Sequence, residues 1–516
     1  MDDRVASALK LLPDYLGQHV LLSACALVLG LAVSAPLIVL ARRSPRVRWP
    51  VLAFVSVIQT VPSLALLALF YPLLLALSSL SLKVFGHGFA ALGFLPSLLA
   101  LTLYSMLPIV RNGVTGLLNV DAAVIEAARG VGMTGRQSLL RVELPLAMPV
   151  IMAGIRTSAV WVIGTATLST PVGQTSLGNY IFSGLQIENW VSVLFGCASA
   201  VALALVADQL LALVENGVAT RRPLRIWLGL ALLVGGIIVA VAPAVTSVRS
   251  TYVIGAKSFS EQYILSALMA DRVRSVGATA TERAGLGSVI AFKALSNNEI
   301  DAYVDYSGTV WANVLARTDS PAREQMLTEL RAELKSRYGV TMLGALGFEN
   351  AYALAMRRDR AESLGIHSIA DLSRHAGELR LGTDFEFLAR PEWAALRDRY
   401  SLAFREQRQY QSTFMYRAVA GGEVDVISAF SSDGRIAAYD LVVLEDPQQV
   451  ILPYDAIVLL SPKRAADETL RRALAPLVDA VPIERMRAAN QMVDREENKL
   501  SPAQAAEWLE REAALR

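Results

Sequence analysis

The first half of the chain contains six long stretches almost free of charged residues, and these constrain the fold more than any other feature. Each has about 20 residues or more, enough for a helix to cross the roughly 30 Å hydrocarbon core of a membrane. The stretches span residues 20–41, 49–82, 84–110, 144–168, 190–214 and 226–248, and only Arg156 and Asp208 interrupt them. We therefore expect six transmembrane helices in a lipid bilayer.

Charge separates the chain of 516 residues into two halves. Residues 1–250 carry 16 basic and 9 acidic side chains, whereas residues 251–516 carry 32 and 37. So apolar a first half excludes an ordinary soluble domain and a disordered chain, while the second half has the composition of a soluble globular domain. The net charge of +2, without a basic patch or arm, argues against nucleic acid as a partner.

Arginines in alternate connections predict how the helices are oriented. They gather at positions 42–48, 111–141 and 221–225, and basic residues in short loops mark the cytoplasmic side. Both ends of the apolar half, and the whole second half, are therefore expected outside the cytoplasm, joined by a linker of very few residues. The N-terminus has no basic segment leading into an apolar one, so we expect no cleaved signal peptide. Cys25 and Cys197 lie inside the stretches, so the outer domain is expected to have no disulfide.

The second cytoplasmic connection, residues 121–145, has the pattern of a helix, a break at Gly132 and a second helix. Six of its residues resemble the EAA loop of ABC importer permeases, with Val142 as the one departure: Glu126, Ala127, Ala128, Gly132, Leu144 and Pro145. The resemblance implies an all-α permease of the type I importers, working as a homodimer and coupled through this loop to a cytoplasmic ATPase. That ATPase must be a separate chain, because the sequence holds no G-x-x-x-x-G-K-[ST] phosphate loop. The alternative is an amphipathic interfacial helix with this spacing by chance.

From residue 252 onward, short β runs alternate with amphipathic helices, which is typical of an α/β domain with largely parallel sheets. The β runs span residues 252–256, 278–283, 300–306, 379–383, 403–407, 424–430, 441–446 and 454–460. Six ordered segments resemble binding proteins for glycine betaine, choline and carnitine, namely 257–262, 301–309, 350–352, 386–391, 425–435 and 452–456. The resemblance implies a bilobed periplasmic-type binding domain over residues 251–516, beside a permease domain over residues 1–250.

The same resemblance implies which residues bind the ligand. Tyr306, Tyr352, Phe430 and Tyr454 would form an aromatic cage, and Lys257, Gln262, Thr309, Asn350 and Arg390 would be its polar partners. A quaternary ammonium has no N–H group, so aromatic faces are what can attract it, and Arg390 could hold a carboxylate with two hydrogen bonds. Ser260, Ser307 and Ser431 stand where a strand gives way to a helix, as N-caps beside anion-favouring helix ends. Phe430 stands where Tyr is usual, and Ser307 where Thr is usual, which leaves the ligand's identity open.

The sequence thus predicts the permease and substrate-binding subunit of an ATP-driven importer in the bacterial inner membrane, for a small quaternary ammonium compound such as glycine betaine, choline or carnitine. We expect no catalytic residues, cofactor or metal, since His367 and His375 have no further ligand at metal spacing. Two alternatives stay open. The ligand could be a larger betaine such as ergothioneine, a trimethylated histidine derivative, or the chain could be a ligand-gated channel or sensor, in which the loop at 121–145 has no use.

Overall fold

The computed structural model describes residues 3–86, 89, 91–187, 189–246, 252–317, 319–495 and 498–513. The chain divides into two compact units. One comprises Met1–Phe182 and Trp190–Val248, and the other comprises Ser183–Asn189 and Arg249–Arg516. Residues 247–251, which hold the end of the sixth predicted span and the expected short linker, lie outside the described residues.

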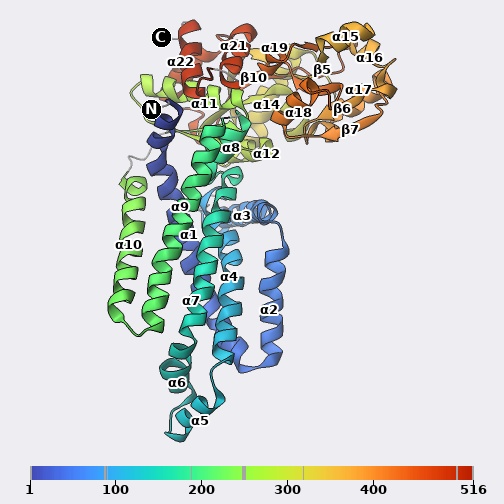
Figure 1. Cartoon of the computed structure of the whole chain (residues 1–516). Helices are drawn as coiled ribbons and strands as arrows, with labels where there is room; N and C mark the ends of the chain where they lie inside the picture. The colour runs from blue at the N-terminus through green and yellow to red at the C-terminus, as the bar shows by residue number, and fades with distance from the viewer. Residues whose placement is uncertain are drawn as a thin grey trace. The chain divides into compact units, whose positions relative to one another are not determined.

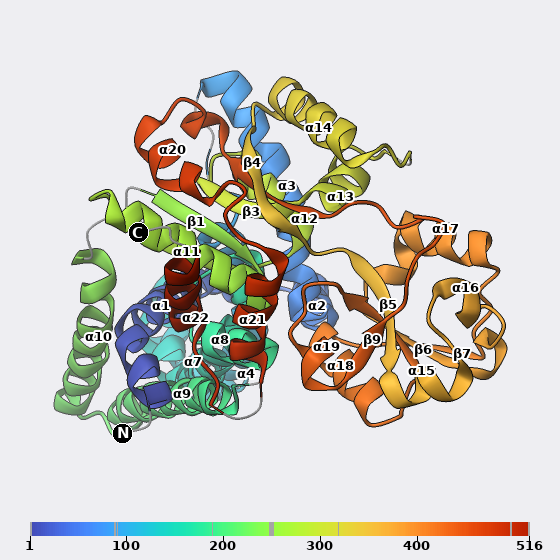
Figure 2. The ribbon, with the colours of Figure 1, turned by 90° about the horizontal axis from the view of Figure 1, so that it is seen from above.

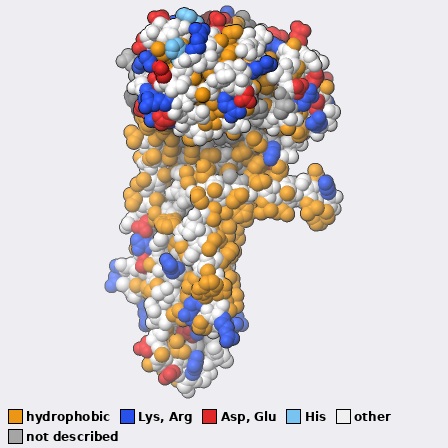
Figure 3. Space-filling view, turned by 90° about the vertical axis from the view of Figure 1, so that its right-hand side faces the viewer, with side chains coloured by type: hydrophobic (Ala, Val, Ile, Leu, Met, Phe, Trp, Pro, Cys, Tyr) orange, Lys and Arg blue, Asp and Glu red, His pale blue; other side chains and the backbone are white. Residues whose placement is uncertain are grey.

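Long helices make up the first unit (Figure 1). They are α1 (Asp3–Arg43), α2 (Pro45–Thr60), α3 (Ser63–Phe85), α4 (Phe94–Leu118), α7 (Leu144–Ala166), α9 (Trp190–Ala219) and α10 (Pro223–Thr246). The boundary between the two units falls inside α8 (Gly178–Gln186). Within the described residues, six segments are long and apolar enough to cross a membrane, as predicted: Ala8–Arg43, Ser63–Phe85, Phe94–Leu118, Gly135–Val172, Trp190–Ala219 and Pro223–Pro243. Figure 3 shows hydrophobic side chains along the sides of this unit and basic ones toward the end that carries residues 121–145.

The prediction of one helix across residues 49–82 is wrong, because the chain breaks there into α2 and α3. Val61 has extended backbone angles, φ −70° and ψ 128°, and Pro62 follows it. A proline disfavours helical angles in the residue before it and has no N–H for the helix ladder, so the break falls at this dipeptide. Helix α3 is seen nearly end-on in Figure 1 and lengthwise in Figure 2, so it lies across the other helices.

The cytoplasmic connection folds as a helix, a break and a second helix, as predicted. Helix α5 (Ala122–Gly130) ends before Gly132, whose φ of +83° lies in the left-handed region that glycine adopts without strain. Helix α6 (Gly135–Ser138) follows, and a π-turn over Leu139–Glu143 leads into α7. Glu126 and Ala127 are exposed and Ala128 is buried against the rest of the loop. Part of the first helix of the loop is thus exposed, and the role of the loop in coupling stays a prediction.

Two five-stranded sheets form the second unit (Figure 2). The first has the order β2 (Ala280–Leu286), β1 (Tyr252–Lys257), β3 (Ala302–Tyr306), β10 (Asp455–Leu460), β4 (Thr341–Glu349). The second has the order β7 (Glu406–Gln409), β6 (Arg380–Thr383), β8 (Val426–Phe430), β5 (Tyr352–Arg357), β9 (Leu441–Val443). Each sheet with its flanking helices is one lobe, and the alternation of strands and helices predicted from the sequence is confirmed.

The expectation of largely parallel sheets is wrong for half of the strand pairs. In the first sheet β10 runs antiparallel to β3 and β4, and in the second β5 runs antiparallel to β8 and β9. The reason is that the chain crosses between the lobes from β4 directly into β5 and returns to the first lobe at β10. Strands that enter a sheet from the other lobe need not follow the right-handed helical crossover that keeps neighbouring strands parallel.

Helices on both faces bury each sheet. The first sheet carries α11 (Ser260–Ser275), α12 (Ser288–Ser296), α21 (Ile483–Asp494) and α22 (Pro502–Glu512) among its helices, and the second carries α17 (Pro391–Tyr400), α18 (Ser412–Ala420) and α19 (Arg435–Ala438). Strands β3 and β10 are buried over their whole length. Two segments join the lobes, one at Asn350–Ala351 between β4 and β5 and the other just before β10.

Candidate ligand-binding site

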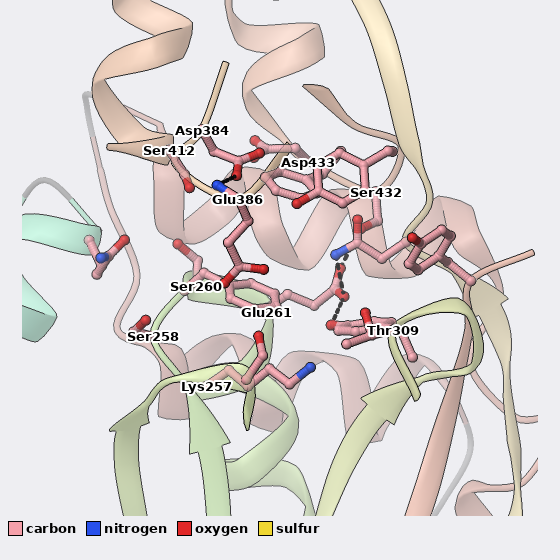
Figure 4. A pocket seen from close by; sticks show the side chains of 18 of the residues that line it. Lys257, Ser258, Ser260, Glu261, Thr309, Asp384, Glu386, Ser412, Ser432 and Asp433 are labelled. Carbon is pink, nitrogen blue, oxygen red and sulfur yellow. Dashed lines mark hydrogen bonds between the residues drawn. The ribbon is translucent and has the colours of Figure 1, made fainter. Parts of the chain in front are cut away.

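A cavity of about 280 Å³ lies where residues of the two lobes meet (Figure 4). Its lining includes eight of the nine residues predicted to bind the ligand: Lys257, Tyr306, Thr309, Asn350, Tyr352, Arg390, Phe430 and Tyr454. The ninth, Gln262, is buried behind the wall and donates a hydrogen bond of 3.0 Å to the hydroxyl of Tyr306. The fold thus brings the predicted residues together, and their role in binding stays a prediction.

The aromatic side chains meet because they stand at strand ends on facing edges of the sheets. Tyr352 and Phe430 are directly opposite each other in the antiparallel β5–β8 pair, with ring centroids 4.9 Å apart. Tyr454 comes just before β10, and its ring lies edge-on to Tyr352 at 6.0 Å. Phe387, which the sequence analysis did not single out, adds a further ring 5.1 Å from Tyr352. Tyr352 is therefore the centre of an aromatic cluster.

Tyr306, at the end of β3, has its own surroundings in the first lobe. Phe259 stacks on its ring at 6.1 Å, and the Lys257 ammonium lies 5.3 Å from the ring centroid. Lys257 also forms an ion pair with the buried Asp305, so its charge is already neutralised by the protein. Burial and the neighbouring Glu261 carboxylate raise the pKa of the Tyr306 hydroxyl well above its usual value. This phenol stays protonated at any physiological pH.

Arg390 lies over the aromatic cluster and is held by acidic neighbours. Its guanidinium carbon lies 4.9 Å from the Tyr352 centroid, and Nη2 donates to Glu386 at 2.9 Å. Nη1 donates to the Tyr454 hydroxyl at 3.4 Å, and that hydroxyl donates in turn to the buried Glu392. Tyr454 and Glu386 accept from only two of the five N–H groups of this guanidinium, and Nε has no hydrogen-bond partner among the described residues, so donors remain for a ligand carboxylate.

The prediction that three serines cap helix N-termini is wrong. Helix α11 and the short helix at Ser307–Thr309 begin one residue earlier than a serine cap would need, since Phe259 and Tyr306 occupy the cap positions. Ser260 donates instead to Asp494 at 2.6 Å, and Ser307 donates to the carbonyl of Pro453 at 2.9 Å. The Ser431 hydroxyl accepts from the backbone N–H of Ala351 at 2.9 Å. These serines therefore tie chain segments together.

Glu261 is, besides Phe387, a residue of this site that sequence reasoning missed. Its carboxylate accepts hydrogen bonds from four side chains: Tyr306 Oη at 2.5 Å, Asn350 Nδ2 at 3.1 Å, Ser432 Oγ at 2.6 Å and Asn490 Nδ2 at 2.9 Å. The donors come from both lobes and from the crossing segment, and Figure 4 shows Glu261 and Ser432 among the side chains of the cavity. Burial raises the pKa of this carboxyl group. In the sequence, Glu261 stands next to Gln262 in a segment that resembles the binding-protein family. That position does not show that the side chain is buried.

The first unit holds a polar cluster within its predicted spans. Arg156 of α7 makes two hydrogen bonds of 3.0 Å to Asp208 of α9 and one of 2.6 Å to Glu215. These contacts tie α7 to α9, and a structural role accounts for them. Across the ranges that the structure describes, no three His, Cys, Asp or Glu side chains lie close enough together to hold a metal ion.

Known proteins resemble both parts of the chain. The family described as "Substrate binding domain of ABC-type glycine betaine transport system" matches residues 250–511, and "Binding-protein-dependent transport system inner membrane component" matches residues 26–220. The ergothioneine transport permease/ergothioneine binding protein of Helicobacter pylori is 27% identical over 79% of this chain and 74% of its own. The glycine betaine/carnitine/choline permease of Bacillus subtilis is 40% identical over 40% of this chain and 87% of its own. A solved glycine betaine/carnitine/choline ABC transporter structure is 26% identical over 51% of this chain and 98% of its own, with a TM-score of 0.45.

Proposed function

The chain belongs to the family of ABC importers of the glycine betaine type, as a multi-pass inner-membrane permease fused to its extracytoplasmic substrate-binding domain, and we propose that it imports a small quaternary ammonium compound. Glycine betaine, choline and carnitine are the ligands of this class that we propose first. ATP is hydrolysed by a separate cytoplasmic ATPase that binds the loop at residues 121–145. Two copies of the chain form the translocation pathway, so that each pathway has two receptors.

The observation that supports the proposal is the aromatic wall of the cavity. Four aromatic residues from β3, β5, β8 and the approach to β10 converge on one cavity. A trimethylammonium group offers no hydrogen-bond donor, so a site for it needs aromatic faces, each worth about 0.5–2 kcal/mol. Arg390, at the edge of the same cluster, suits a carboxylate at the ligand's other end.

A second candidate ligand is ergothioneine. The relative that shares this fused arrangement over 79% of the chain is an ergothioneine permease/binding protein, whereas the glycine betaine/carnitine/choline relative matches over 40%. Phe430 also stands where a tyrosine is usual in the glycine betaine, choline and carnitine group. The missing hydroxyl leaves room for a ligand other than those three. Ergothioneine carries a trimethylammonium and a carboxylate group, as glycine betaine and carnitine do, so the cage and Arg390 offer it the same two kinds of contact.

The test is calorimetric binding to the full chain in detergent, with glycine betaine, choline, carnitine and ergothioneine titrated side by side. A preference of about 1.4 kcal/mol is already tenfold in affinity and identifies the ligand. Tyr306→Ala and Tyr454→Ala should each weaken binding about tenfold or more. Tyr439→Ala, at the end of α19 and outside the cavity lining, is the matched control. Binding of none of the four ligands, or an unchanged affinity in both cage variants, would refute the proposal.

Transport separates the importer from a channel. We expect uptake of the identified ligand in cells to stop when the gene of the partner ATPase is deleted. Uptake that persists without the ATPase would favour a ligand-gated channel, since diffusion through a channel needs no ATP.

A further inference from the structure

Glu261 is a buried carboxylate without a cationic partner in the part of the chain that the structure describes. Its four hydrogen-bond donors are all neutral: a phenol, a hydroxyl and two amides. Burying an ion without an opposite charge is costly, because hydrogen bonds replace only part of the lost hydration. Among the other charged groups at this wall, Lys257 is paired with Asp305 and Arg435 with Asp433. Asp384 and Asp494 also line the cavity, but neither accepts a hydrogen bond from Tyr306. The four donated hydrogen bonds favour the ionised form of Glu261 against its burial, so a cation that enters the cavity can offset a charge that no described cationic side chain pairs.

The hydrogen bonds also fix the direction in which the Tyr306 hydroxyl points its proton. The backbone N–H of Lys257 donates to Oε1 of Gln262 at 3.2 Å, which identifies the other side-chain atom of Gln262 as the amide nitrogen. That nitrogen donates to the Tyr306 oxygen at 3.0 Å, so the hydroxyl proton goes to Glu261. A phenol that donates to a carboxylate becomes richer in electrons, and a ring richer in electrons attracts a cation more strongly.

We propose that Glu261 is a positioning residue that makes the cavity select cations, through the Tyr306 ring and through its own uncompensated charge. This inference rests on the proposed function, since it concerns the cation that the cage binds. The separate claim is that the preference for a positively charged ligand depends on Glu261, which lies behind the aromatic wall, as well as on the aromatic rings themselves.

Tyr454 shows why Glu261 differs from the other carboxylate behind the cage. The Tyr454 hydroxyl also donates to a buried glutamate, Glu392. Arg390, however, lies 3.9 Å from that carboxylate and bonds the same hydroxyl, so a cation of the protein already offsets its charge. Glu261 therefore contributes more to charge selection than Glu392.

The experiment compares two probes of nearly equal shape, choline and 3,3-dimethyl-1-butanol, in which carbon replaces the charged nitrogen. Binding of both to the full chain in detergent gives a ratio of affinities that measures charge selection. In Glu261→Gln we expect this ratio to fall about tenfold relative to the unsubstituted protein. Tyr306→Phe should lower it as well, and the double variant should lower it no further than the stronger single change, because the two groups act as one unit.

The matched control is Asp446→Asn. Asp446 accepts a hydrogen bond of 2.5 Å from Tyr400, whose oxygen accepts from the backbone N–H of Gln448, which is the same arrangement away from the cavity. This control should leave the ratio unchanged. Glu261→Gln that weakens both probes equally would overturn the inference and show a structural role, while the four-ligand titration still decides the proposed function. Should Glu261→Gln fail to fold, the test passes to Tyr306→Phe, and an unchanged ratio of affinities in that variant overturns the inference. An unsubstituted protein that binds choline no more tightly than 3,3-dimethyl-1-butanol overturns it as well.

Discussion

Gly308→Ala should damage the ligand site through a contact with Tyr454. A Cβ atom at position 308 would lie 2.8 Å from two ring atoms of Tyr454 and 2.9 Å from the carbonyl oxygen of Pro453. The ring would have to move by about 0.6 Å to reach an ordinary contact distance of 3.4 Å. It has little freedom to do so, because Tyr454 is buried and its hydroxyl is held by Glu392 and Arg390.

The expected cost of this substitution is about 1–3 kcal/mol, the usual range for overpacking a well-filled core. If the displaced ring accounts for all of it, ligand affinity falls roughly 5- to 150-fold. The assay is calorimetry on the full chain with whichever of the four ligands binds most tightly, together with the melting temperature. Gly377→Ala is the control, since a Cβ there meets only the carbonyl oxygen of Ala403 at 3.9 Å. Affinity and melting temperature both unchanged in Gly308→Ala would refute the contact argument.

Three further predictions concern other parts of the chain. Gly132→Val, at φ +83° with open space around it, should strain only the coupling loop, so uptake falls while ligand affinity stays the same; equal losses in both would contradict this. Arg156→Met leaves two carboxylates unpaired within the spans, and because Arg156 is 29% exposed we expect a loss of about 1–3 kcal/mol, seen as a lower melting temperature in detergent that Asp208→Asn partly restores. Burial raises the pKa of Asp494 to about 6, above the ordinary 3.8, so the folded state binds this proton more tightly than the unfolded one. The melting temperature of the unsubstituted protein should therefore fall relative to Asp494→Asn as the pH rises from about 4 to 7, and parallel curves would contradict the assignment.

The sequence predicted the strands that obey local preference and missed the two that do not. The segments of β4 and β5, Thr341–Glu349 and Tyr352–Arg357, are rich in Ala, Leu, Met and Gly, which have weak strand preferences. Strand β5 is hydrogen-bonded on both sides, to β8 and β9, and the edge strand β4 is hydrogen-bonded to β10, so both are strands because of the assembled sheet. The break at Val61–Pro62 had a local signal, but the apolar run through it favoured one continuous helix.

The candidate site divides in the same way. The cage residues were accessible to sequence reasoning because each stands at a strand end in a segment that resembles a known family. Glu261 was not, since a glutamate in the first turn of a helix is usually exposed, and only the packing of α21 and the crossing segment buries it. The ion pair of Lys257 with Asp305 forms because β1 and β3 are neighbours in the sheet. The local sequence of neither strand predicts that pairing.

The position of β10 in the first sheet also determines the order in which the two lobes can fold during synthesis. This strand lies between β3 and β4 and closes the first sheet, yet it is made more than a hundred residues after them. The second lobe, encoded in between, can complete its sheet while β3 and β4 still have open edges that invite wrong pairing. The ligand cavity includes Tyr454, so it cannot form until nearly the whole chain has left the ribosome and the outer domain has crossed the membrane as far as this residue. A chain interrupted before residue 455 would therefore reach the outer face unable to hold a ligand and prone to aggregate there.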